Sequence, residues 1–121
     1  MSGRFSRLKP DSNERKEFWE KIVNNVQNLL DEVNNDVFDG KGKFKTSAQF
    51  SGSYSNPPQI QHPYLFLEIE AEGAIAICTA SELELRVIAE RDSGTYRWQS
   101  WECTPNKLEK NIEYAVKFVV G

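Results

Sequence analysis

The chain has 121 residues, of which 39% are hydrophobic, 27% charged and 12% aromatic, and its formal net charge at pH 7 is −3. This length suits one domain with one core, and the aromatic content argues against a disordered chain. The acidic balance disfavours a general nucleic-acid binder, because such binding comes from phosphate neutralisation by Lys and Arg.

The sequence shows no stretch typical of membrane insertion or secretion. Its longest unbroken apolar run, residues 74–78, is far shorter than a membrane span, and residues 1–10 lack the apolar centre of a signal peptide. We therefore expect a cytoplasmic protein. Residues 1–10 carry only basic charges and are expected to form a flexible tail, with residues 11–121 forming a single α+β domain.

A long helix is predicted first. Asp11 followed by Glu14 has the spacing of a capping box, and apolar residues then recur at helical spacing from Phe18 to Val33. The polar residues 34–36 end this pattern. The helix should therefore bury one apolar stripe and expose the opposite side.

Strands are predicted in the middle of the chain. Alternating apolar and polar residues from 44 to 50 indicate a half-buried strand, and residues 55–63 form a loop whose three prolines favour an extended path. Being the least regular segment, this Pro-rich loop is a candidate ligand-facing one. Residues 64–71 and 74–79 then predict one hairpin, and residues 83–90 and 95–103 a second.

The last predicted element is a helix capped by Thr104, with Pro105 in its first turn and apolar residues on one stripe. Two helices with one apolar stripe each need a surface to bury it, and the sheet is the only large one. We therefore predict an α+β fold, a two-layer sandwich with both helices on one face of a four- or five-stranded antiparallel sheet.

The second hairpin carries two tryptophans, Trp98 and Trp101, which must lie on opposite faces of the sheet because side chains alternate along a strand. If the turn contains an even number of residues (the even loop), Ala89 pairs with Trp98 and Arg86 with Trp101. Trp98 then enters the core and Trp101 lies on the open face. A register shifted by one, with Gly94 in a bulge, would place Arg86 opposite Ser100 and Glu84 opposite Glu102. The like charges of this second register disfavour it.

The even loop predicts an interaction surface on the open face of the sheet. Aromatic and Arg side chains are enriched in the cores of protein interfaces, and this face would show such residues. They are Trp101, Arg86, Tyr64 and Phe66. The alternative is that these side chains are ordinary half-exposed aromatics that pack on one another or under the Pro-rich loop.

Catalytic patterns are weak in this sequence. His62 is the only histidine, so any His-dependent chemistry must pass through it, and it follows no nucleophile motif. A pocket around His62, with Glu68 and Glu70 as carboxylates, is the enzymatic alternative. Alternate glutamates on a strand are more often its solvated side, and no metal site or cofactor is expected. Cys78 and Cys103 are expected to be free thiols, although the sequence does not show whether they approach each other.

Lysines in the segment 39–45 open a third alternative. Glycines and lysines there could hold a phosphate, but the P-loop spacing is missing, and lysines that protect an edge strand are the favoured interpretation. Nucleic-acid binding would use Lys41, Lys43 and Lys45 with the basic tail residues Arg4, Arg7 and Lys9. We rank this third, after a small hydrolase or ligand-binding enzyme.

The leading hypothesis is a non-enzymatic binding module. It would interact with a second copy of itself, as a homodimer, or with another protein, through the open sheet face or the Pro-rich loop. The absence of a recognisable catalytic constellation in the sequence supports this order of hypotheses.

Overall fold

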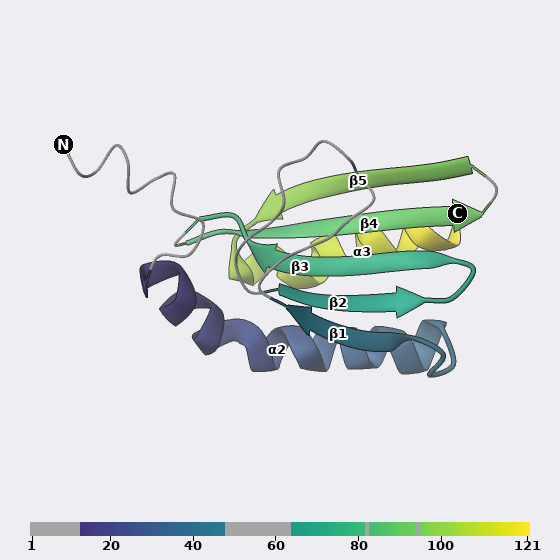
Figure 1. Ribbon diagram of the computed structural model, residues 1–121. Coiled ribbons are helices and arrows are strands. Elements are labelled where there is room, and N and C mark those ends of the chain that lie inside the picture. The colour runs from purple at the N-terminus through teal and green to yellow at the C-terminus, as the bar shows by residue number, and fades with distance from the viewer. Residues whose placement is uncertain (1–12, 48–63, 82, 94) are drawn as a thin grey trace.

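The computed structural model describes residues 13–47, 64–81, 83–93 and 95–121, which form two α-helices, one short 3-10 helix and a five-stranded sheet (Figure 1). The predicted tail, Asp11 and the Pro-rich loop with His62 lie outside these residues. The elements are α2 (Asn13–Val37), β1 (Lys43–Ser47), β2 (Tyr64–Ile69), β3 (Gly73–Thr79), β4 (Leu85–Ser93), β5 (Thr95–Cys103), η1 (Pro105–Lys107) and α3 (Leu108–Val120).

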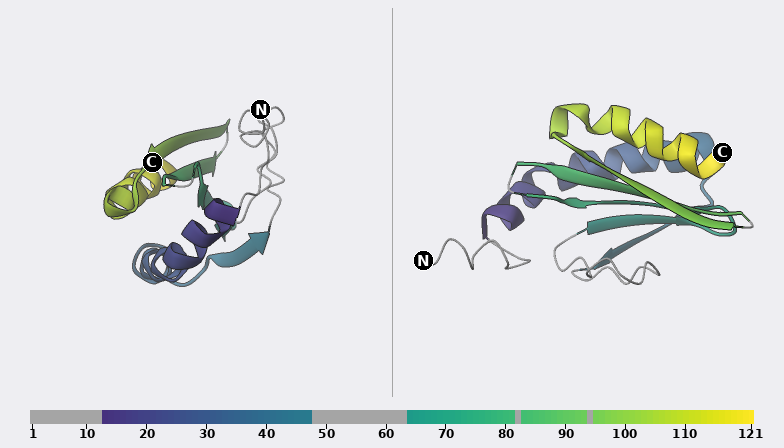
Figure 2. Two further views of the ribbon diagram at one scale, coloured as in Figure 1. Left: turned by 90° about the vertical axis from the view of Figure 1, so that its left-hand side faces the viewer. Right: turned by 90° about the horizontal axis from the view of Figure 1, so that it is seen from above.

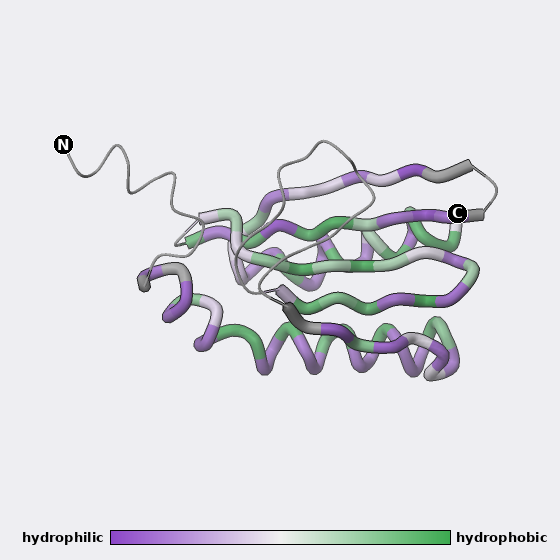
Figure 3. The backbone as a smooth tube through the Cα atoms, viewed as in Figure 1, coloured by the Kyte–Doolittle hydropathy of each residue, from purple (hydrophilic) through white to green (hydrophobic). Residues whose placement is uncertain are grey.

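The sheet is an antiparallel meander with the strand order β1-β2-β3-β4-β5. Each strand therefore pairs with its neighbours in the sequence, which short turns permit between antiparallel strands. This order makes β1 and β5 the two edges of the sheet. Its middle strand, β3, is buried along nearly its whole length, and Figure 3 shows hydrophobic colours along most of it.

Both helices lie on the same face of this sheet (Figure 2). Helix α2 packs against β2 and β3, whereas α3 packs chiefly against β4 and also contacts β3 and β5. The predicted α+β sandwich with two helices on one face is confirmed. None of the described helices combines the length and the apolar character that crossing a membrane requires.

The main core lies between the two layers. Val26 and Leu30 from α2 and Leu108 and Ile112 from α3 meet the inward side chains of the strands, and all four are buried. Burying an aliphatic side chain of this size stabilises the fold by about 1.5–3 kcal/mol. The strand residues of this core are Leu65, Leu67, Ile69, Ile75, Ile77, Leu85, Val87, Ala89 and Cys103.

A tight connection joins α2 to β1. The main-chain N–H groups of Phe38 and Gly40 both donate to the carbonyl of Asn34, at 3.2 and 2.8 Å, and Asp39 and Gly40 adopt positive φ angles of 53° and 74°. The left-handed conformation suits Gly and is tolerated by Asp, which explains why these residues reverse the chain. The turn brings Lys41 and β1 alongside β2.

The start of the C-terminal helical region differs from the prediction in one detail. Thr104 precedes η1 with extended backbone, but its side chain makes no capping hydrogen bond to the main chain. Its hydroxyl instead donates to Asn106 Oδ1, so the neighbouring amide side chain takes the bond that a cap would use. Pro105 opens the 3-10 turn, where its missing N–H leaves no partner unsatisfied.

Candidate functional site

The register of the β4–β5 hairpin differs from both registers considered above. Ala89 pairs with Gln99, Val87 with Trp101 and Arg86 with Glu102, and the same register continues to the pair Ser93 and Thr95. Relative to the even loop, the partner of each β4 residue moves by one position. Because side chains alternate along a strand, this shift exchanges the two faces of β5.

The prediction that Trp98 is the core tryptophan and Trp101 the open-face one is therefore wrong. Trp101 lies on the helix side, where its ring centroid is 6.4 Å from those of Tyr114 and Phe118 on α3. Trp98 lies on the opposite side and is 47% exposed. In the observed register Trp101 packs against aromatic side chains of α3, and Arg86 lies opposite Glu102.

Arg86 and Glu102 form an ion pair on the face away from the helices. The Nη2 of Arg86 lies 2.7 Å from Glu102 Oε2, and both side chains are about half exposed. The Nε of Arg86 is buried and has no hydrogen-bond partner among the described residues. Arg86 thus lies on the predicted face, but its charge is already paired along the β4–β5 ladder.

The middle of this face is not an open apolar surface. Tyr64, Ala76, Cys78 and Ile88 form a second cluster of buried residues there, against which Phe66 packs. Tyr64 is only 8% exposed and packs edge to face on Phe66, with 6.4 Å between the two ring centroids. The expectation that Tyr64 belongs to an exposed interaction surface is therefore corrected, because it is a buried member of this second cluster.

Exposed side chains concentrate instead on β5. The side chains of Arg97, Trp98, Gln99 and Ser100 are all exposed, and among the described residues no strand or helix lies beyond this edge. This surface was not predicted from the sequence, because alternation of side chains indicates the faces of a sheet but not which strands are its edges. The run of polar residues around Trp98 was the available signal for an uncovered strand.

Hydrogen bonds to β4 show which backbone groups of β5 point outward. The N–H of Asp92 donates to the carbonyl of Glu72, the residue before β3, and the N–H of Ala80 donates to the carbonyl of Glu84. Since main-chain groups alternate along a strand, even-numbered residues of β4 point toward β3 and odd-numbered ones toward β5. With the observed register, Trp98, Ser100 and Glu102 direct their N–H and C=O groups away from the sheet.

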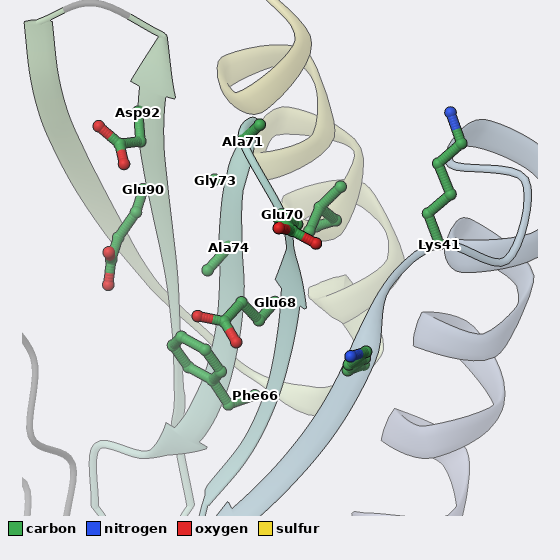
Figure 4. A pocket seen from close by; sticks show the side chains of 11 residues that line it. Lys41, Phe66, Glu68, Glu70, Ala71, Gly73, Ala74, Glu90 and Asp92 are labelled. Carbon is green, nitrogen blue, oxygen red and sulfur yellow. The ribbon is translucent and has the colours of Figure 1, made fainter.

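A cleft of about 450 Å³ lies on the face away from the helices, next to the β2–β3 turn (Figure 4). Ala74 pairs with Glu68 on one side and Glu90 on the other, so its small side chain leaves a hollow between two carboxylates. Figure 4 shows Glu90 and Asp92 projecting from β4 and Phe66 and Glu68 from β2. Lys41, Lys43 and Glu70 complete the charged lining.

The charged groups of the described cleft lining are carboxylates and ammonium groups. Glu68 also forms an ion pair with Lys45, with 2.9 Å between Lys45 Nζ and Glu68 Oε1. The described lining contains no Ser, Thr, Cys or His side chain that could act as a nucleophile or imidazole base. Within the described ranges, no group of three or more His, Cys, Asp or Glu side chains could hold a metal ion.

The two cysteines lie on opposite faces of the sheet. Cys103 belongs to the core under the helices and Cys78 to the second cluster, and both are buried thiols that form no disulfide. The expectation of free thiols is therefore confirmed. Burial, and secondarily the negative charge of Glu84, raise the pKa of the Cys103 thiol. A thiol that resists ionisation is a poor nucleophile.

Comparison of the chain with protein-family models, with curated proteins and with solved structures gave no match. The function must therefore be inferred from the surfaces described above.

Proposed function

We propose that this protein is a non-catalytic protein-interaction module that forms a homodimer through the exposed edge strand β5. The observation that carries the proposal is the nine-residue length of β5 at an edge that no described element covers. A long edge strand with outward N–H and C=O groups is a template for pairing with another strand.

The two edges of the sheet differ in how well they are protected against such pairing. Edge strand β1 has only five residues and carries Lys43 and Lys45, both exposed, which oppose the approach of another strand. Edge strand β5 is longer and presents Trp98 and Gln99, which are exposed and uncharged. Pairing should therefore occur at β5.

A second copy of the chain suits this edge because β5 is self-complementary about Gln99. In an antiparallel pair with Gln99 on the two-fold axis, Trp98 and Ser100 exchange the main-chain hydrogen bonds, which matches their outward backbone groups. The Gln99 amides can then bond to each other. Arg97 approaches Trp101 of the other copy, where a cation–π contact adds about 0.5–1 kcal/mol.

The other hypotheses receive less support. The enzymatic alternative combines His62 with Glu68 and Glu70; both glutamates line the cleft, but Glu68 is paired with Lys45, and His62 lies outside the described residues. Nucleic-acid binding would need free cationic side chains, but Lys45 is paired with Glu68, and Lys41 and Lys43 share their cleft with carboxylates. A foreign protein strand is the natural competitor of the second copy for the β5 edge.

Ser100→Pro tests the proposal, with Ser100→Ala as the matched control. Proline removes an outward N–H group that the dimer needs, whereas alanine removes only the exposed hydroxyl. Light scattering at two concentrations should give about twice the 13.9 kDa chain mass for the wild type and the alanine variant. The proline variant should give the chain mass itself.

Thermal unfolding monitored by circular dichroism shows whether the proline variant is folded. A folded Ser100→Pro protein that stays dimeric would overturn the β5 interface. A wild-type protein that is monomeric at both concentrations would exclude the homodimer, and the edge would then be tested for a foreign strand.

A further inference from the structure

The outer side of the helix layer contains a second candidate binding surface, distinct from the β5 edge. Helices α2 and α3 both lie on the sheet, and a groove of about 290 Å³ opens between them. Its apolar lining comes from both helices, with Leu29 and Val33 on α2 and Ile112 and Val116 on α3. Val37, at the end of the groove, is 43% exposed.

Carboxylates line both rims of this groove. Glu32 and Asp36 come from α2, and Glu109 and Glu113 from α3, whereas Lys117 is the only cationic residue among the described residues of the lining. All four carboxylates lie on exposed residues, and none forms an ion pair with another described residue. An apolar floor between acidic rims is complementary to a basic amphipathic segment.

The placement of these charges is unfavourable for the helices themselves. Glu32 and Asp36 are four residues apart, as are Glu109 and Glu113, and like charges at this spacing destabilise a helix. Asp36 also lies in the last turn of α2, which contains no basic residue, at the negative end of the helix dipole. A cationic ligand in the groove would relieve both unfavourable interactions.

We infer that the α2–α3 groove binds a basic amphipathic helix of another protein. Leu29 to Val37 covers about 12 Å of helix axis, as does Glu109 to Lys117, so each wall is long enough for two turns of a bound helix. Apolar side chains at helical spacing would contact Val33 and Val116 on the floor. Lysines or arginines on the flanks would face the rim carboxylates.

The chain's own basic tail fits this groove poorly within one molecule. Leu29 lies about 24 Å along the axis from the first residue of α2, and Asp36 about 34 Å. Arg7 precedes Asn13 by six residues, which span at most about 22 Å even when fully extended. Of residues 1–12, only Arg4 could therefore reach the rims, so within one molecule this segment offers the groove one cation at most, and the proposed occupant is a cationic segment of another protein.

A designed peptide tests the inference on the full chain. The probe is a fluorescent helix of about 14 residues with leucines at i, i+3/i+4 spacing and lysines elsewhere, and its scrambled form has the same composition. Anisotropy titrations should show saturable binding of the helix and much weaker binding of the scrambled peptide. Shifts in NMR amide spectra should cluster in residues 29–37 and 109–117.

Charge neutralisation provides matched variants. Glu32→Gln/Glu113→Gln removes two rim carboxylates, whereas Glu17→Gln/Glu20→Gln removes two exposed carboxylates of α2 outside the groove. The first pair should weaken binding about tenfold and the second less than about twofold. If both double variants lost the same affinity, or if the scrambled peptide bound as tightly as the helix, net charge alone would explain the binding. Either result would overturn the inference.

Two further measurements separate the competing occupants. A peptide of residues 1–12 that binds more tightly than the designed helix would assign the groove to the chain's own tail and overturn the inference. A loss of dimer mass in the rim variant would assign the groove to a second copy, with the same consequence. Because the groove does not involve β5, Ser100→Pro should bind the designed helix with unchanged affinity.

Discussion

The side-chain amide of Asn34 bonds to both main-chain groups of Gly42. The N–H of Gly42 donates to Asn34 Oδ1 at 2.7 Å, and Asn34 Nδ2 donates to the carbonyl of Gly42 at 3.3 Å. A methyl group on Gly42 would come within 2.5 Å of Leu67 Cδ1 and 2.7 Å of Asn34 Oδ1. The end of α2 is thereby joined to the start of β1 by a contact that requires both residue types.

Asn34→Ala should lower the free energy of unfolding by about 1–3 kcal/mol, because the main-chain groups of Gly42 lose their partners in a partly buried position. Asn34→Asp keeps the acceptor but loses the donor, and adds a charge near the negative end of α2, so it should also destabilise. Urea denaturation followed by circular dichroism measures both. Wild-type stability in Asn34→Ala would show that solvent replaces the two bonds.

The two tryptophans of β5 should differ in what they contribute to stability. Trp101→Ala removes contacts with Tyr114 and Phe118 and should lower the free energy of unfolding by about 2–4 kcal/mol. Trp98→Ala removes a half-exposed side chain and should cost less than about 1 kcal/mol. Urea denaturation at a concentration where the protein is monomeric makes the comparison. The reverse order of the two losses would mean that the alternation along β5 is opposite to the one described.

A cysteine scan tests the register of the proposed dimer. A residue on the two-fold axis faces its own copy at a Cα separation of about 4.5–5.5 Å, which suits a disulfide. Gln99→Cys should therefore form a covalent dimer under mild oxidation, whereas Trp98→Cys and Ser100→Cys should not. Non-reducing electrophoresis gives the result, with the wild type as control for its two buried thiols. Cross-linking through position 98 or 100 alone would shift the axis by one residue.

The raised pKa of Cys103 predicts a pH dependence of stability. Burial favours the neutral thiol in the folded state, so the unfolded chain loses this proton at lower pH than the folded protein does. The contribution to stability is complete below the ordinary thiol pKa of 9.0 and is lost as the pH rises toward the raised folded pKa. Cys103→Ala should therefore show a shallower loss of stability than the wild type between pH 8 and about 10, the range around the ordinary thiol pKa. Parallel curves would mean that other groups cause the alkaline loss.

The helices, the hairpins and the layer arrangement could be predicted because each depends on residues close in the sequence. The apolar stripe from Phe18 to Val33 and the glycine at position 73 specify their elements locally. The sheet order also follows from such neighbours, since every pairing joins consecutive strands.

The faces of β5 could not be predicted in the same way. Their assignment depends on a one-residue difference in the hairpin register and on packing between Trp101 and α3, which begins only after the strand has ended. Cross-strand pairs within the hairpin favour the register that places Arg86 opposite Trp101. The observed register offers Arg86 and Glu102 instead. The α2–α3 groove was also missed, because its two walls come from opposite ends of the chain.

The meander order has a consequence for how the protein is made. During synthesis each strand emerges beside the one that it will pair with, so the sheet can grow in the direction of translation without inserting a strand between earlier ones. At every stage the newest strand is the growing edge, and the next strand covers it. Strand β5 is the last in this series, and the position beside it is where a strand from another molecule would continue the same growth.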